Sequence, residues 1–580
     1  MDTSLTESRD RIRQAIDDEI NSWQESTRAL RSRRNALAPI SRLSPETLAS
    51  IFFLLSFPRN GDNFSRFWEP AKSPLMRVAH VCRRWRETAL NNPHFWSHIN
   101  FTKLKPLGMA EIVARAKMAP LDLQANVFNW SREKFDVFER QLEVHVSQIR
   151  SLSIHGQFQT TLQRLVSPAP TLESLSLSYY LSGSHQVDIP DDLFNSTAPS
   201  LKRLELDCCD ISWKSPLLKG LRSLKIRRPS AKARPELKDW LNALNEMPKL
   251  ETLILESASL PVPLVIPELL RAITLPFLTD FRISAPANDC VLALTHLVMP
   301  ALIWQHVDVE SYGGEGEDAH RVLPYIVRNV YGLLETKPLR SIQIQGSRRL
   351  VVVHAWTLPN ADRKFYDVFA PIPANLMFTA RGKWLKGVGN AILDALLTLL
   401  PVNSVSAFTV RGTTKLCKEF WLSHMPRLPL LERVLLVPSA VKVFRALLGE
   451  DAPPDGPRLP SLTKLTLINL TLTGLRTYDL QDMLMERVEQ GVSLEVLDLR
   501  LCFASYRAIQ LLRETVVEVC EPSAWQMTVE EPDSCRGIGS CDEVEYDDRR
   551  DPFYDIDYED SDEDTVECDN DGDWEYYDYL

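Results

Sequence analysis

Cysteine and histidine are the side chains of this sequence best suited to catalysis or metal binding, but their spacing favours neither. The ten cysteines and eleven histidines are scattered, without the C-x-x-C or H-E-x-x-H spacing that brings zinc ligands together. Cys535, Cys541 and Cys568 lie among carboxylates, which would raise the pKa of a thiol and disfavour a nucleophile. The glycine-rich run at residues 313–316 lacks the strand and helix that flank a phosphate-binding loop. We therefore expect no enzymatic activity, no cofactor and no metal site; an active site within residues 300–430 is the alternative left open.

Charge is distributed unevenly along the 580 residues. The net charge of -11 hides an acidic tail, because residues 542–580 contain 19 Asp and Glu against Arg549 and Arg550. The residues before this tail are therefore mildly basic. A charge density this high cannot be offset by burial, so residues 528–580 are expected to be disordered. The overall acidity argues against broad nucleic-acid binding.

Targeting and membrane signals are not evident in the sequence. No stretch of 18 uncharged apolar residues exists, so no transmembrane helix and no membrane contact are expected. The N-terminal residues are charged and lack the apolar core of a secretory signal. The scattered cysteines, with one adjacent pair at Cys208 and Cys209, fit free thiols in a reducing compartment better than a disulfide framework. We expect a cytoplasmic or nuclear location.

Residues 1–38 are expected to form one amphipathic helix that ends before Pro39. Apolar residues recur every seven positions on a charged background, as they do in a coiled coil: Ile16, Trp23, Leu30 and Leu37. The helix could dimerise as a coiled coil, or it could pack on the module that follows. We favour packing, because three or so heptads are short for a coiled coil.

A small helical module is expected at residues 39–101. Ser44, Pro45 and Glu46 form a helix-start signal, with a capping residue, a proline at the first helical position and an acidic residue in the first turn. Two helices with apolar residues at helical spacing follow: Leu48, Ile51, Phe52 and Leu55 on the first, and Val78, Val81, Cys82 and Trp85 on the second. A module this short buries little surface by itself, so we expect a partner to complete it.

A leucine pattern repeats within residues 146–527. The unit is L-x-x-L-x-L, as in PTLESLSL at residues 170–177, and successive units from Ile149 start 23, 29, 20, 29 and 28 residues apart. Leucine-rich repeats have periods of roughly 20–29 residues. The alternating leucines would line one face of a short strand, and neighbouring units would stack into a solenoid because no unit can bury that face alone. Residues 102–145 are expected to be a linker and a first capping repeat.

Some positions depart from the simple repeat. Residues 346–388 predict two strands with a loop between them, which we interpret as a hairpin inserted between repeats, where insertions often map to the binding face. Cys209 and Cys502 follow the last leucine of their units by three positions, where such repeats often place a residue that bonds the turning backbone. The expected fold class is α/β, with an N-terminal helix, a small all-α module, a horseshoe-like leucine-rich-repeat solenoid and a disordered acidic tail.

The module at residues 40–99 resembles the F-box. The family's start, Leu-x-Pro-Glu-x-Leu-x-x-Ile-Phe, is matched by Leu43, Pro45, Glu46, Leu48, Ile51 and Phe52. The family's later half, Val-Cys-x-x-Trp-x-x-x-Ala and then Pro-x-x-Trp, is matched by Val81, Cys82, Trp85, Ala89, Pro93 and Trp96. The loop between the two halves, residues 58–73, is longer than in the family. The wider layout, with a helix before the module and irregular repeats after it, is similar to the F-box families of mushroom-forming fungi.

The resemblance implies a substrate-recognition subunit of a Skp-cullin-F-box ubiquitin ligase. The F-box would dock on the Skp adaptor, and through it on a cullin, while the repeats would bind an unknown protein substrate. The alternative is a non-enzymatic leucine-rich-repeat scaffold that binds the adaptor without mediating ubiquitination. The residues implied in adaptor binding are Leu43, Pro45, Leu48, Ile51, Phe52, Val81, Cys82, Trp85, Phe95 and Trp96. Most of them could instead form the module's own core, and Phe95 and Trp96 could seat the segment that follows.

Overall fold

The structure is a computed structural model of the 580-residue chain. It describes the following residues: 2–56, 74–180, 186–230, 235–257, 272–310, 317–346, 350–359, 374–382, 388–412, 420, 423–436, 459–472, 475–523 and 526–528. The loop expected at residues 58–73, the glycine-rich run at 313–316 and the acidic tail from residue 529 lie outside the described residues.

The expected N-terminal helix is α1 (Asp2–Ala36). It ends where the Ser41 hydroxyl donates a hydrogen bond to the Asn35 carbonyl at 2.7 Å. The apolar residues of the seven-residue pattern are all exposed: Ile16, Trp23, Leu30 and, just beyond the helix, Leu37. Packing of this helix on the following module, the interpretation favoured above, is therefore wrong for the chain as described. The seven-residue pattern is local, and it does not reveal which other surface, if any, covers the helix.

The described residues of the helical module form five short elements. They are η1 (Pro39–Arg42), α2 (Pro45–Ser56), α3 (Pro74–Ala79), α4 (Arg83–Asn91) and η3 (Pro93–Trp96). The second helix expected from the sequence is thus two helices. Cys82 has an extended backbone (φ -157°, ψ 169°) and stands at the N-cap of α4, so Val81 and Cys82 form the turn between α3 and α4.

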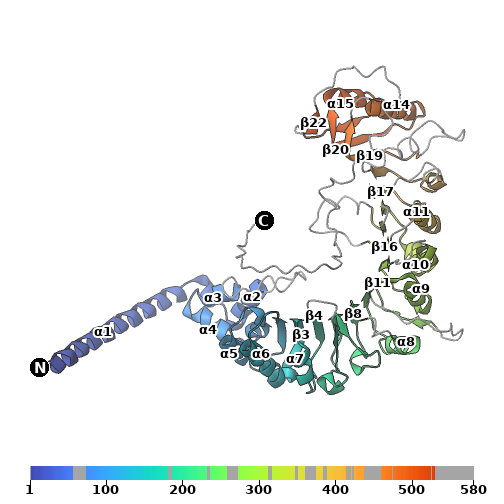
Figure 1. Ribbon diagram of the computed structural model, residues 1–580. Coiled ribbons are helices and arrows are strands. Elements are labelled where there is room, and N and C mark those ends of the chain that lie inside the picture. The colour runs from blue at the N-terminus through green and yellow to red at the C-terminus, as the bar shows by residue number, and fades with distance from the viewer. Residues whose placement is uncertain are drawn as a thin grey trace, which may run out of the picture. The chain divides into compact units, whose positions relative to one another are not determined.

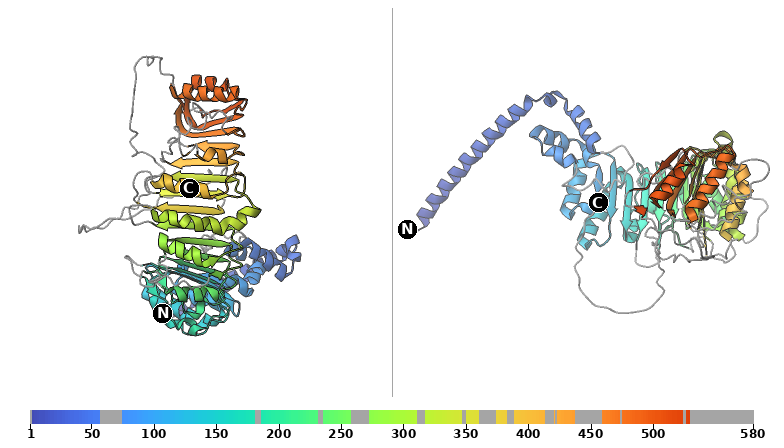
Figure 2. Two further views of the ribbon diagram at one scale, coloured as in Figure 1. Left: turned by 90° about the vertical axis from the view of Figure 1, so that its right-hand side faces the viewer. Right: turned by 90° about the horizontal axis from the view of Figure 1, so that it is seen from above.

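Eighteen strands form one sheet that begins inside this module. Nine strands pair in parallel and in chain order: β1 (His98–Asn100), β2 (Leu121–Asn126), β3 (Ile149–Gly156), β4 (Ser174–Tyr179), β6 (Arg203–Asp207), β8 (Ser223–Arg227), β9 (Thr252–Glu256), β11 (Asp280–Pro286) and β13 (Trp304–Glu310). Because β1 and β2 pair, residues 98–126 join the module to the sheet without a break. Figure 2 shows the successive strands lying next to one another.

The chain order is interrupted in the middle of the sheet. β13 pairs with β16 (Leu376–Arg381), which is antiparallel to β15 (Leu350–Trp356), which is antiparallel to β14 (Ser341–Gly346). The two strands expected within residues 346–388 therefore pair with each other, but they lie in the sheet between β13 and β14 and not on its face. The remaining strands follow β14 in parallel: β17 (Ala407–Gly412), β18 (Arg433–Leu436), β19 (Lys464–Leu472), β20 (Val496–Ser505), and then β21 (Glu518–Cys520) and β22 (Met527–Thr528), both paired with β20.

Helices occupy many of the connections between parallel strands. Such a connection must cross over so that the next strand starts at the same end of the sheet. The helices are α5 (Pro106–Ala116), α6 (Arg132–His145), α7 (Gln159–Arg164), α8 (Leu237–Asn245), α9 (Ala287–His296), α10 (Glu317–Thr336), α11 (Val388–Leu399), α14 (Leu475–Glu489) and α15 (Tyr506–Arg513). Figure 1 shows α8, α9, α10 and α11 along one side of the sheet. Two minor pairs, β5 (Val187–Asp188) with β7 (Cys209–Asp210) and β10 (Ile273–Thr274) with β12 (Leu297–Val298), lie outside the main sheet.

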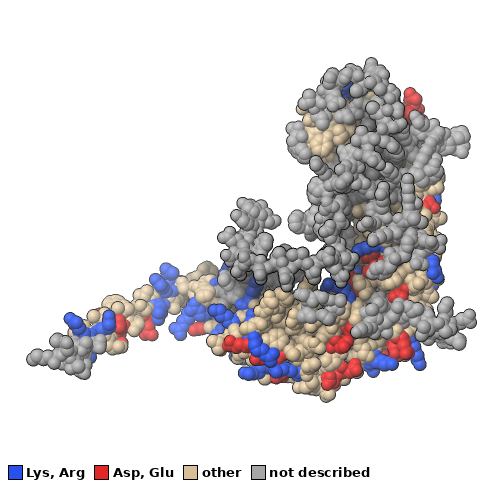
Figure 3. All heavy atoms as spheres, viewed as in Figure 1, with Lys and Arg blue, Asp and Glu red and all other residues tan. Residues whose placement is uncertain are grey.

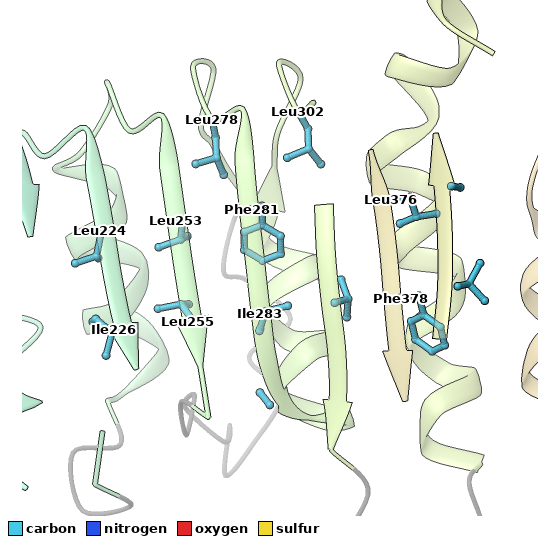
Figure 4. Packing of buried hydrophobic residues seen from close by; sticks show 14 of the residues in the cluster. Leu224, Ile226, Leu253, Leu255, Leu278, Phe281, Ile283, Leu302, Leu376 and Phe378 are labelled. Carbon is cyan, nitrogen blue, oxygen red and sulfur yellow. The ribbon is translucent and has the colours of Figure 1, made fainter. Parts of the chain in front are cut away.

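The leucines of the repeating pattern form the core on the helix-facing side of the sheet. On β6, Leu204 and Leu206 are buried, whereas Arg203, Glu205 and Asp207 are on the other side. The strand register keeps the buried residues in rows. The paired positions from β3 to β11 follow one another at intervals of 23, 29, 20, 29 and 28 residues: Ser151, Ser174, Arg203, Ser223, Thr252 and Asp280. Figure 4 shows two such rows, which include Leu224, Leu253 and Phe281 in one and Ile226, Leu255 and Ile283 in the other.

Candidate functional site

Aromatic packing closes the core of the helical module. Phe52 of α2 is completely buried, with ring centroids 4.9 Å from Trp85 of α4 and 6.3 Å from Phe95 of η3. Leu48, one turn before Phe52, is also completely buried. The i, i+4 spacing of these two residues directs one side of α2 toward α4 and η3. Trp85 is half-buried at the edge of this core.

Trp96 connects the module to the segment that follows. Its indole Nε1 donates a hydrogen bond to the Ala89 carbonyl at 3.0 Å, which satisfies the polar atom of a nearly buried side chain. The guanidinium carbon of Arg115, on α5, lies 5.0 Å from the centre of the Trp96 ring. Trp96 therefore contacts both α4 and the segment that follows the module.

The start of α2 is held by hydrogen bonds between side chains and backbone groups. The Ser44 hydroxyl accepts a hydrogen bond from the Thr47 amide at 3.2 Å, as expected for an N-cap residue. The guanidinium of Arg84, on α4, donates to the carbonyls of Ser41 and Leu43. A cation on a neighbouring helix therefore fixes the chain that leads into α2. Pro45, the first residue of α2, is exposed.

The side of α2 next to the aromatic core, toward the C-terminal end of the helix, is apolar and exposed. Leu54 and Leu55 have exposed fractions of 58% and 59%, and Ile51 has 36%. These three residues, which we call the exposed module face, are spaced i, i+3 and i+4 and therefore lie together on the helix surface. Val81, in the turn between α3 and α4, is also exposed. Apolar side chains gathered on a surface mark interaction sites more often than isolated ones do.

The ten residues expected in adaptor binding divide by burial. Four are buried and form the module's core: Leu48, Phe52, Phe95 and Trp96. Three are half-buried: Leu43, Cys82 and Trp85. Three are exposed and accessible to a partner: Pro45, Ile51 and Val81.

Leu54 was missed by the sequence analysis, and Leu55 was named only as one of the apolar residues at helical spacing and not as a residue that binds the adaptor. The signal was present in the run from Ile51 to Leu55, IFFLL, which is apolar on every side of a helix. A helix of that kind has to be covered all round. The short elements of the module cover only the side that contains Leu48 and Phe52.

The open face of the sheet, on the side away from α8 to α11, has polar side chains paired across strands. Arg227 on β8 bridges Glu205 on β6 at 2.7 Å and Glu256 on β9 at 2.9 Å. Arg228 pairs with Asp207 at 2.7 Å. Opposite charges on adjacent strands stabilise each other modestly, and in this part of the face each of these carboxylates is paired with an arginine.

A cluster of titratable residues lies further along the open face, on β11, β13, β16 and β15. His306 pairs in register with Arg282 on one side and Met377 on the other, and His354 pairs with Met377 on the next strand. Burial, with added repulsion from Arg282, His354 and Arg381, lowers the pKa of His306 to about 4. Burial raises the pKa of Asp308, although Arg381 bridges it at 3.1 Å.

The buried cysteines among the described residues have raised pKa values. They are free thiols, and burial raises the pKa of Cys209 to about 12 and that of Cys502 to about 11. The Cys209 thiol donates instead to the carbonyls of Asp207 at 3.3 Å and Leu177 at 3.7 Å. In the described ranges, no three His, Cys, Asp or Glu residues are grouped as metal ligands would be. None of the helices described combines the length and apolarity that a membrane crossing requires.

Comparison with known protein families identifies one family within this chain. The model of the F-box-like family matches residues 40–102, the segment from η1 through β1 that contains the aromatic core and the exposed module face. The chain therefore contains an F-box-like domain at these residues. No curated protein sequence matches the chain.

Proposed function

We propose that this chain is the substrate-recognition subunit of a Skp-cullin-F-box ubiquitin ligase. One observation supports the proposal: the segment that matches the F-box-like family is also the segment that exposes Ile51, Leu54 and Leu55. F-box domains in general bind a Skp adaptor, and through it a cullin. In this chain the exposed module face would be the surface that the adaptor covers.

The energetics of burial favour such a contact. Removing a leucine or isoleucine side chain from water is worth roughly 1.5–3 kcal/mol when burial is complete. Three such residues on one helix supply part of the binding free energy. This free energy offsets the translational and rotational entropy that two proteins lose when they associate. The remainder would come from residues around this face, among which Pro45 and Val81 are exposed.

We propose further that the strand-rich region is a leucine-rich-repeat solenoid that binds the target protein. Three observations support this: the strands from β2 to β13 pair in parallel and in chain order, their leucines are buried, and their spacing is close to the 20–29 residues of such repeats. The Cys209 thiol, which reaches the Leu177 carbonyl of the neighbouring unit, acts as the turn-bonding residue expected there.

The open face around His306 is the proposed contact surface for the target. On β6, β8 and β9 the charges are already paired with one another, so that part offers little net charge. In the part around His306, this half-buried histidine and the buried Asp308 lie two residues apart on β13 and both have shifted pKa values. Partly desolvated polar groups discriminate strongly between partners, because a partner that leaves them unpaired binds less well.

Adaptor binding can be tested at the exposed module face. The double variant Leu54→Asp/Leu55→Asp places two charges where the adaptor would bury apolar surface, so its affinity for a purified Skp adaptor should fall by about a hundredfold or more. Isothermal titration calorimetry measures this affinity. Leu430→Asp is the matched control, since Leu430 is 48% exposed in the strand-rich region and its replacement should leave the affinity unchanged. Equal affinities for the double variant and the native chain would refute docking at this face.

The outcome of adaptor binding needs a separate measurement. If the chain is a substrate receptor, it should co-purify with the cullin as well as with the adaptor, and proteins held by the strand-rich region should be ubiquitinated in a reconstituted ligase. A scaffold would bind the adaptor and yield no ubiquitinated partner. The Leu54→Asp/Leu55→Asp variant serves as the control, because it should lose the cullin and keep the proteins bound by the sheet.

A further inference from the structure

An exposed apolar stripe runs along α1. Its members are Ile16, Ile20, Trp23 and Leu30, with exposed fractions between 47% and 69%. The helix has 35 residues, which at 1.5 Å per residue gives a length of about 50 Å. A long helix that is apolar along one side and charged elsewhere is stabilised by packing of that side against another surface.

The spacing of the stripe is that of a coiled-coil seam. Ile16, Trp23 and Leu30 are seven residues apart and occupy the d positions of successive heptads, and Ile20 and Thr27 then occupy the a positions. The flanking e positions include Asp17 and Arg31, and the flanking g positions include Glu19 and Arg33. All four of these charged side chains are exposed.

Between residues 14 and 34 the charges of α1 are arranged by sign. From residue 14 to residue 25 the charged residues are acidic: Asp17, Asp18, Glu19 and Glu25. From residue 28 to residue 34 they are basic: Arg28, Arg31, Arg33 and Arg34. Figure 3 shows the basic side chains in view at the end of α1 that adjoins the helical module. The acidic part of one helix therefore complements the basic part of a second helix that runs the opposite way.

We propose that α1 pairs with α1 of a second copy of this chain in an antiparallel coiled coil. In the register that sets Ile20 of one copy opposite Leu30 of the other, Thr27 lies opposite Trp23. In antiparallel pairs e positions face e positions and g positions face g positions. Asp17 then faces Arg31 of the second copy, and Glu19 faces Arg33. The two-fold symmetry repeats each pair, which gives four interhelical ion pairs.

A parallel pairing of the same helices lacks these contacts. In a parallel pair in register, each g position faces the e position five residues later in the other helix. Glu19 would face Gln24, and Ser26 would face Arg31, so no opposite charges would meet. The heptad seam alone permits both orientations, and the charges select the antiparallel one. The two helical modules then leave the helix pair at opposite ends.

Charge reversal tests the pairing and its orientation together. The full chain should sediment at twice its mass of 66.1 kDa at micromolar concentration. Asp17→Arg/Glu19→Arg sets like charges against each other at both ends of the pair, as does Arg31→Asp/Arg33→Glu. Each double variant should dimerise about a hundredfold more weakly. Mixing the two variants restores every attraction, so the mixture should form a heterodimer, and a chain with all four substitutions should form a homodimer again.

A second pair of variants tests the apolar seam. Trp23→Glu should abolish the dimer, whereas Asn21→Glu adds the same charge away from the seam and should leave it intact. Because none of the described side chains of α1 belongs to the buried core of the chain, thermal unfolding of the remaining domains should be unaffected in every variant. A native chain that stays at 66.1 kDa, or a dimer that Asp17→Arg/Glu19→Arg leaves unchanged, would overturn the proposal. Adaptor binding by a monomeric variant would be retained, so this test is independent of the one at Leu54 and Leu55.

Discussion

The F-box-like module and the sheet contain similar apolar residues and expose them to different extents. On α2, Leu48 and Phe52 are buried, while Leu54 and Leu55 are more than half exposed. In the sheet, every leucine of the strands β4, β6 and β8 is buried. Each of these strands has a neighbour on both sides, and its helix-facing side is covered along its length.

The difference follows from how the two regions are built. A row of parallel strands supplies its own covering, because every unit packs against the units before and after it. In the module, the described helices cover the side of α2 that contains Leu48 and Phe52, and they leave Ile51, Leu54 and Leu55 exposed. This contrast is the one expected if the module docks on a second protein, as proposed above.

The largest effect on stability should come from the sheet core. Phe281→Ala removes a completely buried ring on β11, and the lost burial together with the cavity should lower the free energy of unfolding by about 3–5 kcal/mol. Urea unfolding followed by circular dichroism measures this change. Leu55→Ala, at an exposed position, should lower the free energy of unfolding by less than about 0.5 kcal/mol. Similar losses for the two variants would remove the distinction between the regions.

The second effect depends on pH and belongs to the open face of the sheet. His306 has a pKa of about 4 in the folded chain and about 6.5 when unfolded. The unfolded state therefore binds the proton more readily between these values, and stability falls as the pH is lowered. Between pH 6.5 and pH 5 this group should reduce the free energy of unfolding by about 2 kcal/mol at most.

The variant His306→Gln isolates this contribution, because glutamine does not titrate. Its free energy of unfolding should vary less with pH over the same window than that of the native chain. Denaturant unfolding at several pH values gives both slopes. Parallel slopes would mean that His306 is solvated and titrates normally in the folded chain.

A smaller effect compares helix caps in the two regions. Ser44 caps α2 by accepting from the Thr47 amide at 3.2 Å, and Ser505 caps α15 by accepting from the Ala508 amide at 3.1 Å. Replacing either serine with alanine should lower stability by about 1 kcal/mol. If thermal unfolding resolves two transitions, Ser44→Ala should shift the one that includes the module and Ser505→Ala the other. A shift of both transitions by each variant would show that the regions unfold together.

The smallest effect on stability is expected where the effect on binding is large. Leu54→Ser changes an exposed side chain, so the free energy of unfolding should change by no more than about 0.5 kcal/mol. Its affinity for the Skp adaptor should nevertheless fall at least about tenfold, because a buried apolar contact is lost. Calorimetric titration alongside urea unfolding separates the two quantities. A loss of stability as large as that of a core variant would show that Leu54 belongs to the module's own core.

Local patterns predicted the elements well where the pattern repeats within one segment. The alternating leucines of β4 and β6 indicated strands, because period-two alternation is a property of the strand itself. The start of α2 followed from Ser44, Pro45 and Glu46, since capping involves only neighbouring residues. The F-box-like motif was recognised from residue types and spacing, and a family match covers the same segment.

Two other features could not be read from the local pattern. The sequence indicated two strands within residues 346–388, but their place between β13 and β14 depends on pairings with residues that are distant along the chain. The break between α3 and α4 arises from the extended backbone of Cys82. Apolar residues on both sides of that position continue the helical spacing, so the pattern concealed the break.

The sequence by itself determined many of the helices and strands, where the F-box-like motif lies, and that apolar residues recur every seven positions along α1. The tertiary structure alone decided which apolar residues remain at the surface: Leu48 and Leu55 fit the same helical spacing, yet one is buried and the other exposed. The physical reason is that periodicity reports the direction of a side chain relative to its own backbone. Exposure depends on what other segments place in that direction.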